Sequence, residues 1–260
     1  MAMITFTSDF GLKDHYVAAL KARILSDFPS AVIVDITHSI PAFDLIHGSY
    51  VLGSVYDNFP AGTVHIVALN SHKQKTMKFI AAKLDGHFFL LPNNGLLSLI
   101  SEMAPDMVVE LPFSNKSDVS FPEKNILSKA ASQLAKGADL SSLGKAMVDY
   151  EKSLMLKPKA TKSGIFGHVI YIDRFGNLIT NIKRKVFEDL KKLVGPGFDL
   201  NFSKEHLHQI NNHYGDVGEG DIVALFNERD LLEIAVREGN AAQLFGLRYD
   251  SPVRITFEKS

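Results

Sequence analysis

The sequence predicts an α/β domain followed by a smaller antiparallel β domain, and two observations support this prediction. In the first half, short β-branched runs alternate with segments of helical periodicity. This alternation is typical of a mostly parallel sheet with helices on both faces. Beyond about residue 160, strand-like runs follow one another with only short helices between them, which indicates an antiparallel, β-barrel-like sheet. We expect the α/β domain over residues 1–155 and the β domain over 164–260, joined by a lysine-rich linker.

The expected elements follow from apolar periodicity and from turn residues. Helices are expected at 17–28, with Asp14 as N-cap, and at 44–58 and 125–135. Strands of the first domain are expected at 4–7, 31–36 and 63–69, followed by a hairpin of 78–84 and 87–91 that turns at Asp85-Gly86. In the second domain, strands are expected at 167–172, 178–182, 221–226, 231–236 and 253–257.

The composition limits the classes of function. Of 260 residues, 46% are hydrophobic and 22% are charged, and the net charge is -1, so no general attraction to nucleic acid or to an anionic membrane is expected. The absence of cysteine excludes disulfides and thiolate chemistry. The N-terminus lacks a basic signal region, and no apolar run approaches the ~18 residues of a membrane span. These features predict a soluble, cytoplasmic protein.

Motifs of general catalytic use are absent from the sequence. It contains no phosphate-binding glycine loop, no G-x-S-x-G nucleophile motif and no H-E-x-x-H zinc motif. His206 and His208 are close in sequence, but solvated loop histidines are the simpler interpretation. We therefore expect neither a metal nor a separate cofactor.

Polar residues instead stand where predicted strands end. Asp9 follows the first strand, and ligands of open α/β sheets bind beyond the carboxyl ends of the strands. Asp9 is either a carboxylate that holds ribose hydroxyls or a residue that shapes the turn before Gly11. The same two interpretations, ligand contact or ordinary turn, apply to the segments 35–41, 92–95 and 173–177.

Taken together, these segments resemble the S-adenosylmethionine (SAM) hydroxide adenosyltransferases, or SAM hydrolases, which are related to the fluorinase and the chlorinase. The resemblance covers nearly the whole chain in the right order. It is carried by Thr7–Leu12 with Asp14, Val34–Pro41, Phe59–His65, Pro92–Ser98, Ile172–Ile182, Leu232–Val236 and Gly239–Ala242.

The resemblance implies a homotrimer in which a nucleoside ligand lies between the N-terminal domain of one subunit and the C-terminal domain of the next. Asp9 would then hold the ribose hydroxyls, Phe43 would line the sugar, and Asp173 would take the methionine amino group. SAM would be a substrate or ligand, and no further cofactor is implied. Phe175 and Asn177 would meet the adenine, with Glu233 and Val236 near its edge, and the remaining candidate contacts are Asp14, Glu228 and Arg229.

The sequence departs from the family pattern where water is activated. The family uses an Asp, an Arg and a His for this step. Asn70 stands at the Asp position, the Arg position falls at Met77 or Lys78, and Pro122 stands at the His position. An Asn orients water but does not accept its proton as a base, and the proline side chain neither donates nor accepts.

Glu123 is the candidate replacement for the lost base. The alternative is an acidic residue that the helix dipole favours in the first turn of the next helix. At this position the fluorinase has a serine that helps to hold the halide, and a carboxylate repels an anion. The basic loop with Lys73, Lys75 and Lys78 is most simply a solvated surface, and any of its cations in the pocket would disfavour the sulfonium.

Three functions remain open at this stage. The first is an enzyme in which water cleaves SAM to adenosine and L-methionine, with Asn70 and Glu123 as catalytic residues. The second is a binding protein for adenosine or SAM that has lost turnover, which the changes at Asn70, Met77 and Pro122 favour. The third is a halogenase-type substitution, which Glu123 disfavours.

Overall fold

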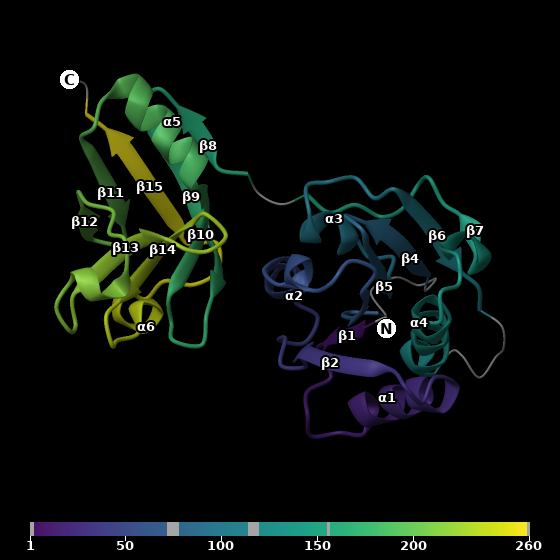
Figure 1. Cartoon of the computed structure of the whole chain (residues 1–260). Coiled ribbons are helices and arrows are strands. Elements are labelled where there is room, and N and C mark those ends of the chain that lie inside the picture. Colours follow the sequence, from purple (N-terminus) through teal and green to yellow (C-terminus); the bar gives the residue numbers. More distant parts are fainter. Residues whose placement is uncertain (1–2, 72–77, 114–119, 155–156, 259–260) are drawn as a thin grey trace. The chain divides into compact units, whose positions relative to one another are not determined.

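The computed structural model describes residues 3–71, 78–113, 120–154 and 157–258. The chain divides into two compact units, Met1–Leu154 and Met155–Ser260 (Figure 1). Within the described residues, no helix combines the length and the apolar composition that crossing a membrane requires.

The N-terminal unit is built on one mixed sheet with the strand order β2-β1-β3-β5-β4-β6-β7. Its strands are β1 (Met3–Ser8), β2 (Val32–Thr37), β3 (Val64–Ala68), β4 (Phe79–Leu84), β5 (His87–Pro92), β6 (Met107–Leu111) and β7 (Lys145–Ala146). The pairs β2–β1, β1–β3 and β3–β5 are parallel, whereas β5–β4, β4–β6 and β6–β7 are antiparallel.

The expectation of a mostly parallel sheet is therefore too simple, and the cause is the β4–β5 hairpin. Asp85 and Gly86 connect its strands with φ of 51° and 76°, the left-handed conformation that a tight two-residue hairpin turn requires. β5 lies beside β3 in the interior of the sheet, and β4, β6 and β7 continue from it in antiparallel fashion. Only the half formed by β2, β1, β3 and β5 keeps a shared carboxyl edge.

Few helices cover this sheet, and they pack on both of its faces. They are α1 (Tyr16–Asp27), α2 (Leu45–Gly53), α3 (Leu97–Ile100) and α4 (Ser128–Ala135), with short turns η1 (Tyr56–Asn58), η3 (Glu123–Leu127) and η4 (Leu140–Ser142). The N-cap of α1 is His15 rather than the predicted Asp14, which is exposed one residue earlier. The N-cap of α2 is Asp44, whose carboxylate accepts the His47 amide at 2.9 Å.

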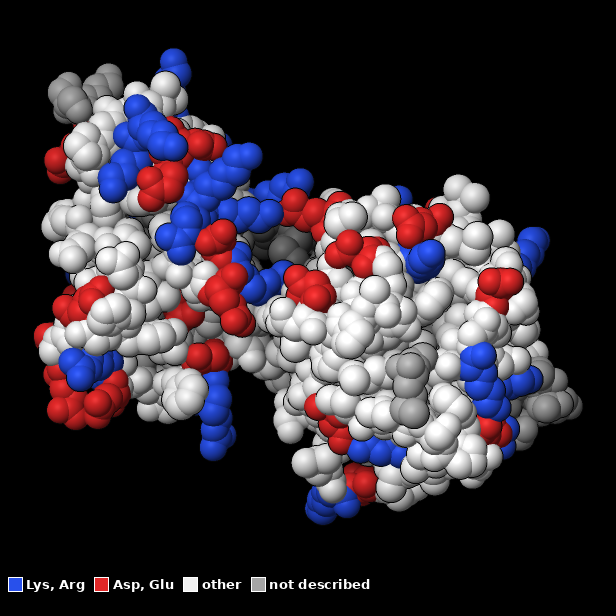
Figure 2. Space-filling view, in the orientation of Figure 1, with Lys and Arg blue, Asp and Glu red and all other residues white. Residues whose placement is uncertain are grey.

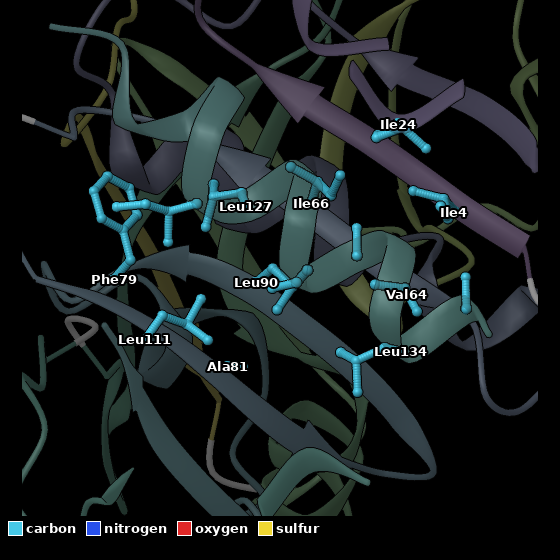
Figure 3. Packing of buried hydrophobic residues seen from close by; sticks show 14 of the residues in the cluster. Ile4, Ile24, Val64, Ile66, Phe79, Ala81, Leu90, Leu111, Leu127 and Leu134 are labelled. Atoms are coloured by element: carbon cyan, nitrogen blue, oxygen red, sulfur yellow. The ribbon is translucent and has the colours of Figure 1, made fainter. Parts of the chain in front are cut away.

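Two clusters of buried hydrophobic residues, one on each face of the sheet, pack the strands against these helices. Ile66 and Leu90 face the cluster that contains α1 and α4, and Figure 3 shows this side of the sheet. The next residues along the same strands, Val67 and Leu91, face the cluster that contains α2 and α3. This alternation follows from the two-residue period of a strand. Each large side chain buried here contributes roughly 1.5–3 kcal/mol, so both faces stabilise the sheet.

The C-terminal unit is an antiparallel, nearly closed barrel-like sheet, in agreement with the predicted β domain. Its strand order is β12-β11-β15-β9-β10-β14-β13, and β8 pairs with β9. The strands are β8 (Lys159–Thr161), β9 (Gly164–Ile172), β10 (Leu178–Lys183), β11 (Phe198–Phe202), β12 (Glu205–Leu207), β13 (Ile222–Phe226), β14 (Leu231–Val236) and β15 (Pro252–Phe257). β8 falls inside the segment that was expected to be a linker.

One helix of this unit is longer than the sequence analysis expected. The helices are α5 (Arg184–Val194) and α6 (Ala241–Phe245), with a short turn η5 (Tyr214–Asp216). α5 has 11 residues and places Phe187 in the barrel core, where its ring contacts those of Phe198, Phe226 and Phe257. Its apolar residues recur at helical spacing, and the sequence analysis overlooked this pattern.

A buried histidine pair joins three strands of the N-terminal unit. The Thr5 hydroxyl on β1 lies 2.7 Å from His65 Nδ1 on β3, and His65 Nε2 lies 3.2 Å from His87 Nδ1 on β5. Burial, together with the facing His87, lowers the pKa of His65 from 6.5 to about 3. The imidazole is therefore neutral in the folded protein over the physiological range.

We expect this histidine to make the protein acid-sensitive. Below the unfolded pKa of 6.5, the unfolded chain binds a proton that folded His65 binds only near pH 3. The free energy of unfolding should fall by about 1.4 kcal/mol per pH unit from this group within that window. Urea unfolding at pH 5, 6 and 7 tests it: the His65→Gln variant should show a shallower pH dependence than the unmodified chain. Parallel pH profiles would contradict the assignment.

Candidate functional site

Asp9 lies at the edge of the sheet where the carboxyl ends of β1, β2 and β3 meet. Asp9 Oδ2 accepts the Phe43 amide at 2.9 Å and the Asn70 amide at 3.3 Å. Phe43 follows β2 and Asn70 follows β3, so a single carboxylate oxygen joins the loops that leave three neighbouring strands. The remaining lone pairs of the carboxylate can accept further donors, such as hydroxyl groups.

The two loops that Asp9 joins are held in unusual backbone conformations. Phe43 has φ of 69° and Asn70 has φ of 45°, both in the left-handed region that non-glycine residues rarely adopt. Asn70 Nδ2 donates to the Phe43 carbonyl at 3.4 Å, so the two loops also bond to each other. The Phe43 side chain is 70% exposed, which leaves its ring available to line a ligand.

Asn94 supports the Asn70 loop from the end of β5. Its amide group donates to the Leu69 carbonyl at 2.9 Å and to the Asn70 carbonyl at 3.3 Å, and its side-chain oxygen accepts the Leu96 amide. The segment 92–95, interpreted from the sequence as a turn or a ligand contact, thus meets Asn70 in space. Asn94 is 4% exposed, so its structural role is clear.

A buried serine and a buried histidine lie next to Asp9. Ser8 Oγ is 2.7 Å from His38 Nδ1, and His38 Nε2 is 3.2 Å from Asp35 Oδ1. Burial lowers the pKa of His38, although the facing Asp35 opposes this effect. Burial by itself raises the pKa of Asp35, but the hydrogen bond from Lys21 and the nearby His38 imidazole outweigh it and lower the pKa overall. Neutral His38 and ionised Asp35 are therefore the favoured states at neutral pH.

Aromatic packing brings the segment with Pro122 and Glu123 close to the end of β1. The Phe121 ring lies 5.8 Å from the Phe10 ring and 5.4 Å from the Tyr16 ring, measured between centroids. Glu123 begins η3 and is 3% exposed. Among the described residues, its carboxylate has no hydrogen-bond or ion-pair partner.

The other predicted residues of this unit are less informative. The Lys78 ammonium forms an ion pair with the Glu110 carboxylate at 3.0 Å. Met77, Lys73 and Lys75 lie outside the described residues. Asp14 is exposed on the segment before α1.

In the C-terminal unit, Asp173 shapes the turn between β9 and β10. Its Oδ1 accepts the amides of Phe175 and Asn177, each at 2.9 Å, and its Oδ2 accepts the Asn177 side-chain amide at 2.9 Å. Phe175 is 72% exposed at the tip of this turn. The Asn177 side chain uses its amide nitrogen to bind Asp173. Its side-chain oxygen takes no part in this network and can accept a hydrogen bond.

The same turn packs against the segment that follows β14. Gly176 has φ of 85°, and a Cβ there would lie 2.2 Å from the side chain of Asn240, so glycine is required. The Ala242 amide donates to the Gly176 carbonyl at 2.9 Å. Val236, the last residue of β14, is 6% exposed. The structure thus brings together the turn, the end of β14 and the segment 239–242.

Glu233 in the middle of β14 is a buried carboxylate with two partners. The Tyr214 hydroxyl donates to Oε1 at 2.5 Å, and Asn227 Nδ2 donates to Oε2 at 3.4 Å. Burial raises the pKa of Glu233, and these two hydrogen bonds oppose the rise. The sequence analysis missed Tyr214, because its short turn showed no periodic pattern. Its single usable signal was an aromatic residue in a polar turn before a strand.

Glu228 and Arg229 lie at the opposite end of β14 from the Asp173 turn. They belong to the turn between β13 and β14, where the Arg229 amide donates to Asn227 Oδ1 at 3.1 Å. β14 runs antiparallel to β10, with Leu231 opposite Lys183, so this turn adjoins the end of β10 and the Asp173 turn its beginning. The structure therefore separates these two groups of predicted residues within the unit.

A surface cavity of about 300 Å³ also lies on the C-terminal unit, away from the Asp173 turn. α5 and residues 196–212 contribute most of its lining, with Arg184, Lys191 and His208 as basic members. Figure 2 shows Lys and Arg side chains gathered over the α5 region of this unit. None of the predicted ligand contacts lines the cavity, so we do not assign the nucleoside to it.

Metal ligands are not gathered anywhere in the described part of the chain, where no group of three or more His, Cys, Asp or Glu side chains could hold an ion. His206 contacts Asp199 at 3.0 Å, and His208 Nδ1 lies 3.0 Å from the Phe198 carbonyl oxygen. Each histidine of this pair thus has its own partner.

Comparison with known proteins identifies relatives over nearly the whole chain. An (R)-S-adenosyl-L-methionine hydrolase of Thermus thermophilus is 29% identical, covering 98% of this chain and all of that protein. A hydrolase of the same name from Methanocaldococcus jannaschii is 27% identical over 98% of this chain and 96% of its own length. A fluorinase of Nocardia brasiliensis is 25% identical over 97% of this chain and 96% of its own length.

Solved structures and family models agree with these relatives. An uncharacterized conserved protein from Thermotoga maritima superimposes with a TM-score of 0.89 and 30% identity, covering 98% of this chain and all of that one. The family model of the SAM hydroxide adenosyltransferase N-terminal domain matches residues 4–144, and that of the C-terminal domain matches residues 167–254. The chain therefore belongs to the SAM hydroxide adenosyltransferase family.

Proposed function

We propose that this protein cleaves SAM with water to give adenosine and L-methionine. The observation that carries the proposal is the Asp9 carboxylate, which lies where the loops after three strands meet and which is fixed there by two backbone amides. Family membership supports the proposal, because the relatives include several named SAM hydrolases.

The reaction asks little of the protein beyond alignment. A water oxygen attacks C5′, and the C5′–S bond breaks with both electrons passing to sulfur, which becomes the neutral thioether of methionine. The water also loses a proton. Because the sulfonium is already a good leaving group, orienting the water and removing its other solvent contacts supply most of the catalysis.

Each residue of the N-terminal unit has a proposed role. Asp9 accepts the ribose hydroxyls, and the exposed ring of Phe43 lines the sugar. Asn70 orients the attacking water through its side-chain amide, since its strained backbone and the Asn94 support fix its direction. Glu123 accepts the proton, because it is the carboxylate of the segment that packs against the end of β1 through Phe121.

The C-terminal unit supplies the base and methionine contacts in this proposal. Phe175 stacks on adenine, Asn177 accepts from its amino group, and Glu233 and Val236 line its edge. Asp173 takes the methionine amino group with its remaining lone pairs. Glu228 and Arg229 contact a more distant part of the ligand. We further propose a cytoplasmic homotrimer in which the contacts of the C-terminal unit come from a neighbouring subunit.

A second function, adenosine binding without turnover, is favoured by one observation. Pro122 is buried and its side chain has no hydrogen-bonding group, so it would supply no acid or base if, as the resemblance implies, it replaces a histidine of the family. Halide attack is disfavoured by Glu123, because a buried carboxylate repels an anion strongly when water is excluded.

The products distinguish these functions. Purified protein incubated with SAM should release adenosine and L-methionine in equal amounts, measured by chromatography. Added chloride should yield no 5′-chloroadenosine, because Glu123 repels the anion. Adenosine binding by calorimetry without any product would replace the hydrolase proposal with the binding function. Absence of both would remove the nucleoside proposal altogether.

The Glu123→Gln variant tests the proposed base. Glutamine keeps the shape of the side chain but does not accept the proton, so kcat should fall by about 10²- to 10⁴-fold while adenosine affinity stays unchanged. Asp57→Asn, a similar change at an exposed carboxylate on η1, serves as the control and should keep full activity. Equal turnover in the Glu123→Gln variant and the unmodified protein would exclude Glu123 as the base.

Asp9→Asn tests the ribose contact. The amide oxygen of asparagine still accepts the Phe43 and Asn70 amides, so the melting temperature should change little. Charge-assisted hydrogen bonds contribute about 1.5–3 kcal/mol, so adenosine should bind about 10- to 100-fold more weakly. Calorimetry with 2′-deoxyadenosine provides the matched ligand, because the variant should discriminate less between the two nucleosides. Unchanged discrimination would show that Asp9 does not contact the ribose.

A further inference from the structure

A chain of polar contacts runs from the surface of α1 to the residue before Asp9. Lys21 on α1 pairs with Asp35 Oδ2, Asp35 Oδ1 lies 3.2 Å from His38 Nε2, and His38 Nδ1 lies 2.7 Å from Ser8 Oγ. Lys21 and Asp35 are partly exposed, whereas His38 is 4% and Ser8 is 0% exposed. This series of polar contacts thus reaches from solvent into the core directly beneath the Asp9 loop.

These residues have the composition of a hydrolytic triad, but Ser8 is not a nucleophile. No surface of Ser8 is accessible, and the Phe6 ring packs against the His38 ring with centroids 4.7 Å apart. A nucleophilic hydroxyl must be within reach of its substrate. The Ser8 hydroxyl is therefore suited to a role that a buried group can perform, which is to fix the neighbouring backbone.

The direction of the hydrogen bonds follows from Asp35. A carboxylate facing Nε2 favours the proton on that nitrogen, even though the contact at 3.2 Å is poorly aligned for a hydrogen bond. Nδ1 of neutral His38 is then an acceptor, so the Ser8 hydroxyl donates to it. The Ser8 oxygen in turn accepts the Phe10 amide at 3.4 Å, a weak bond that lies across Asp9.

His38 also holds the far side of the loop. Its carbonyl accepts the Gly11 amide at 2.8 Å. Contacts to His38 therefore flank Asp9 on both sides, through Ser8 before it and through Gly11 after it. The Asp9 carboxylate is in turn the acceptor for the Phe43 and Asn70 amides.

We propose that Ser8 and His38 are positioning residues that set the direction of the Asp9 carboxylate, with Asp35 and Lys21 selecting the tautomer of His38. They act on the ligand only through Asp9. The effect on affinity rests on the proposed function, whereas the effect on the loop does not.

The same strand offers a matched control. Thr5 on β1 also places a buried hydroxyl 2.7 Å from a histidine Nδ1, that of His65 on β3, but at a point on β1 well before Asp9. Removing either hydroxyl deprives one buried histidine of its partner, so both changes should destabilise the fold similarly. Only the Ser8 contact adjoins the loop.

Amide hydrogen exchange in the protein without ligand is the first test. In Ser8→Ala, the Phe43 and Asn70 amides should exchange about tenfold faster than in the unmodified protein, relative to amides in the centre of β3. In Thr5→Ala, this ratio should stay unchanged. Equal behaviour of the two variants would overturn the proposal, and this result does not depend on whether the protein binds adenosine.

Adenosine affinity and turnover form the second test. Ser8→Ala should weaken adenosine binding and raise KM for SAM about tenfold with a smaller change in kcat, whereas Thr5→Ala should change neither. Protein that binds no adenosine in its unmodified form contradicts the proposed function, and the exchange experiment then decides the positioning role alone.

Two substitutions of His38 separate acceptor geometry from general packing. In His38→Asn, the side-chain oxygen occupies the place of Nδ1 and still accepts from Ser8, so affinity should stay within about threefold of the unmodified protein. In His38→Gln, the longer chain reaches toward Asp35 instead, and affinity should fall about tenfold. Equal affinities in these two variants would show that the acceptor at Nδ1 has no positioning role.

Discussion

The candidate site of the N-terminal unit depends on the Asp9 carboxylate, which accepts hydrogen bonds from the backbone of two loops. Parallel strands deliver their carboxyl ends to one edge, but the loops that leave this edge have no ladder partners of their own. Asp9 Oδ2 provides one by accepting amides from the loops after β2 and β3. Because Phe43 and Asn70 both adopt left-handed backbone conformations, the surrounding hydrogen bonds must compensate for their strain.

The sequence allowed the location of this edge to be predicted, because β-branched runs followed by polar residues mark strand ends. It also allowed the antiparallel second sheet and the β4–β5 hairpin to be predicted from strand patterns and from Asp85-Gly86. Local patterns did not reveal how the hairpin inserts beside β3, so the mixed character of the first sheet was missed. α5 was overlooked although its apolar residues recur at helical spacing.

Contacts between distant residues explain what could not be predicted of the candidate site. Ser8 and His38 are thirty residues apart in sequence, and Asp9 and Asn70 are sixty-one apart. No local rule states that a hydroxyl on one strand will meet an imidazole after another. The Tyr214 contact with Glu233 is of the same kind, since it joins a short turn to the middle of β14. Packing creates these pairs, and single-sequence patterns do not record it.

The wide separation of these partners has a consequence for how the site comes into being. The β4–β5 hairpin closes through two residues, so its contacts need little loop closure. The Asp9 contacts, by contrast, exist only when β1 has docked between β2 and β3, which joins segments from the first seventy residues. Pairings between segments this far apart in the chain carry a larger loop-closure entropy cost than the hairpin does. The edge that would hold adenosine therefore has no local precursor, and it is complete only once these three strands are paired.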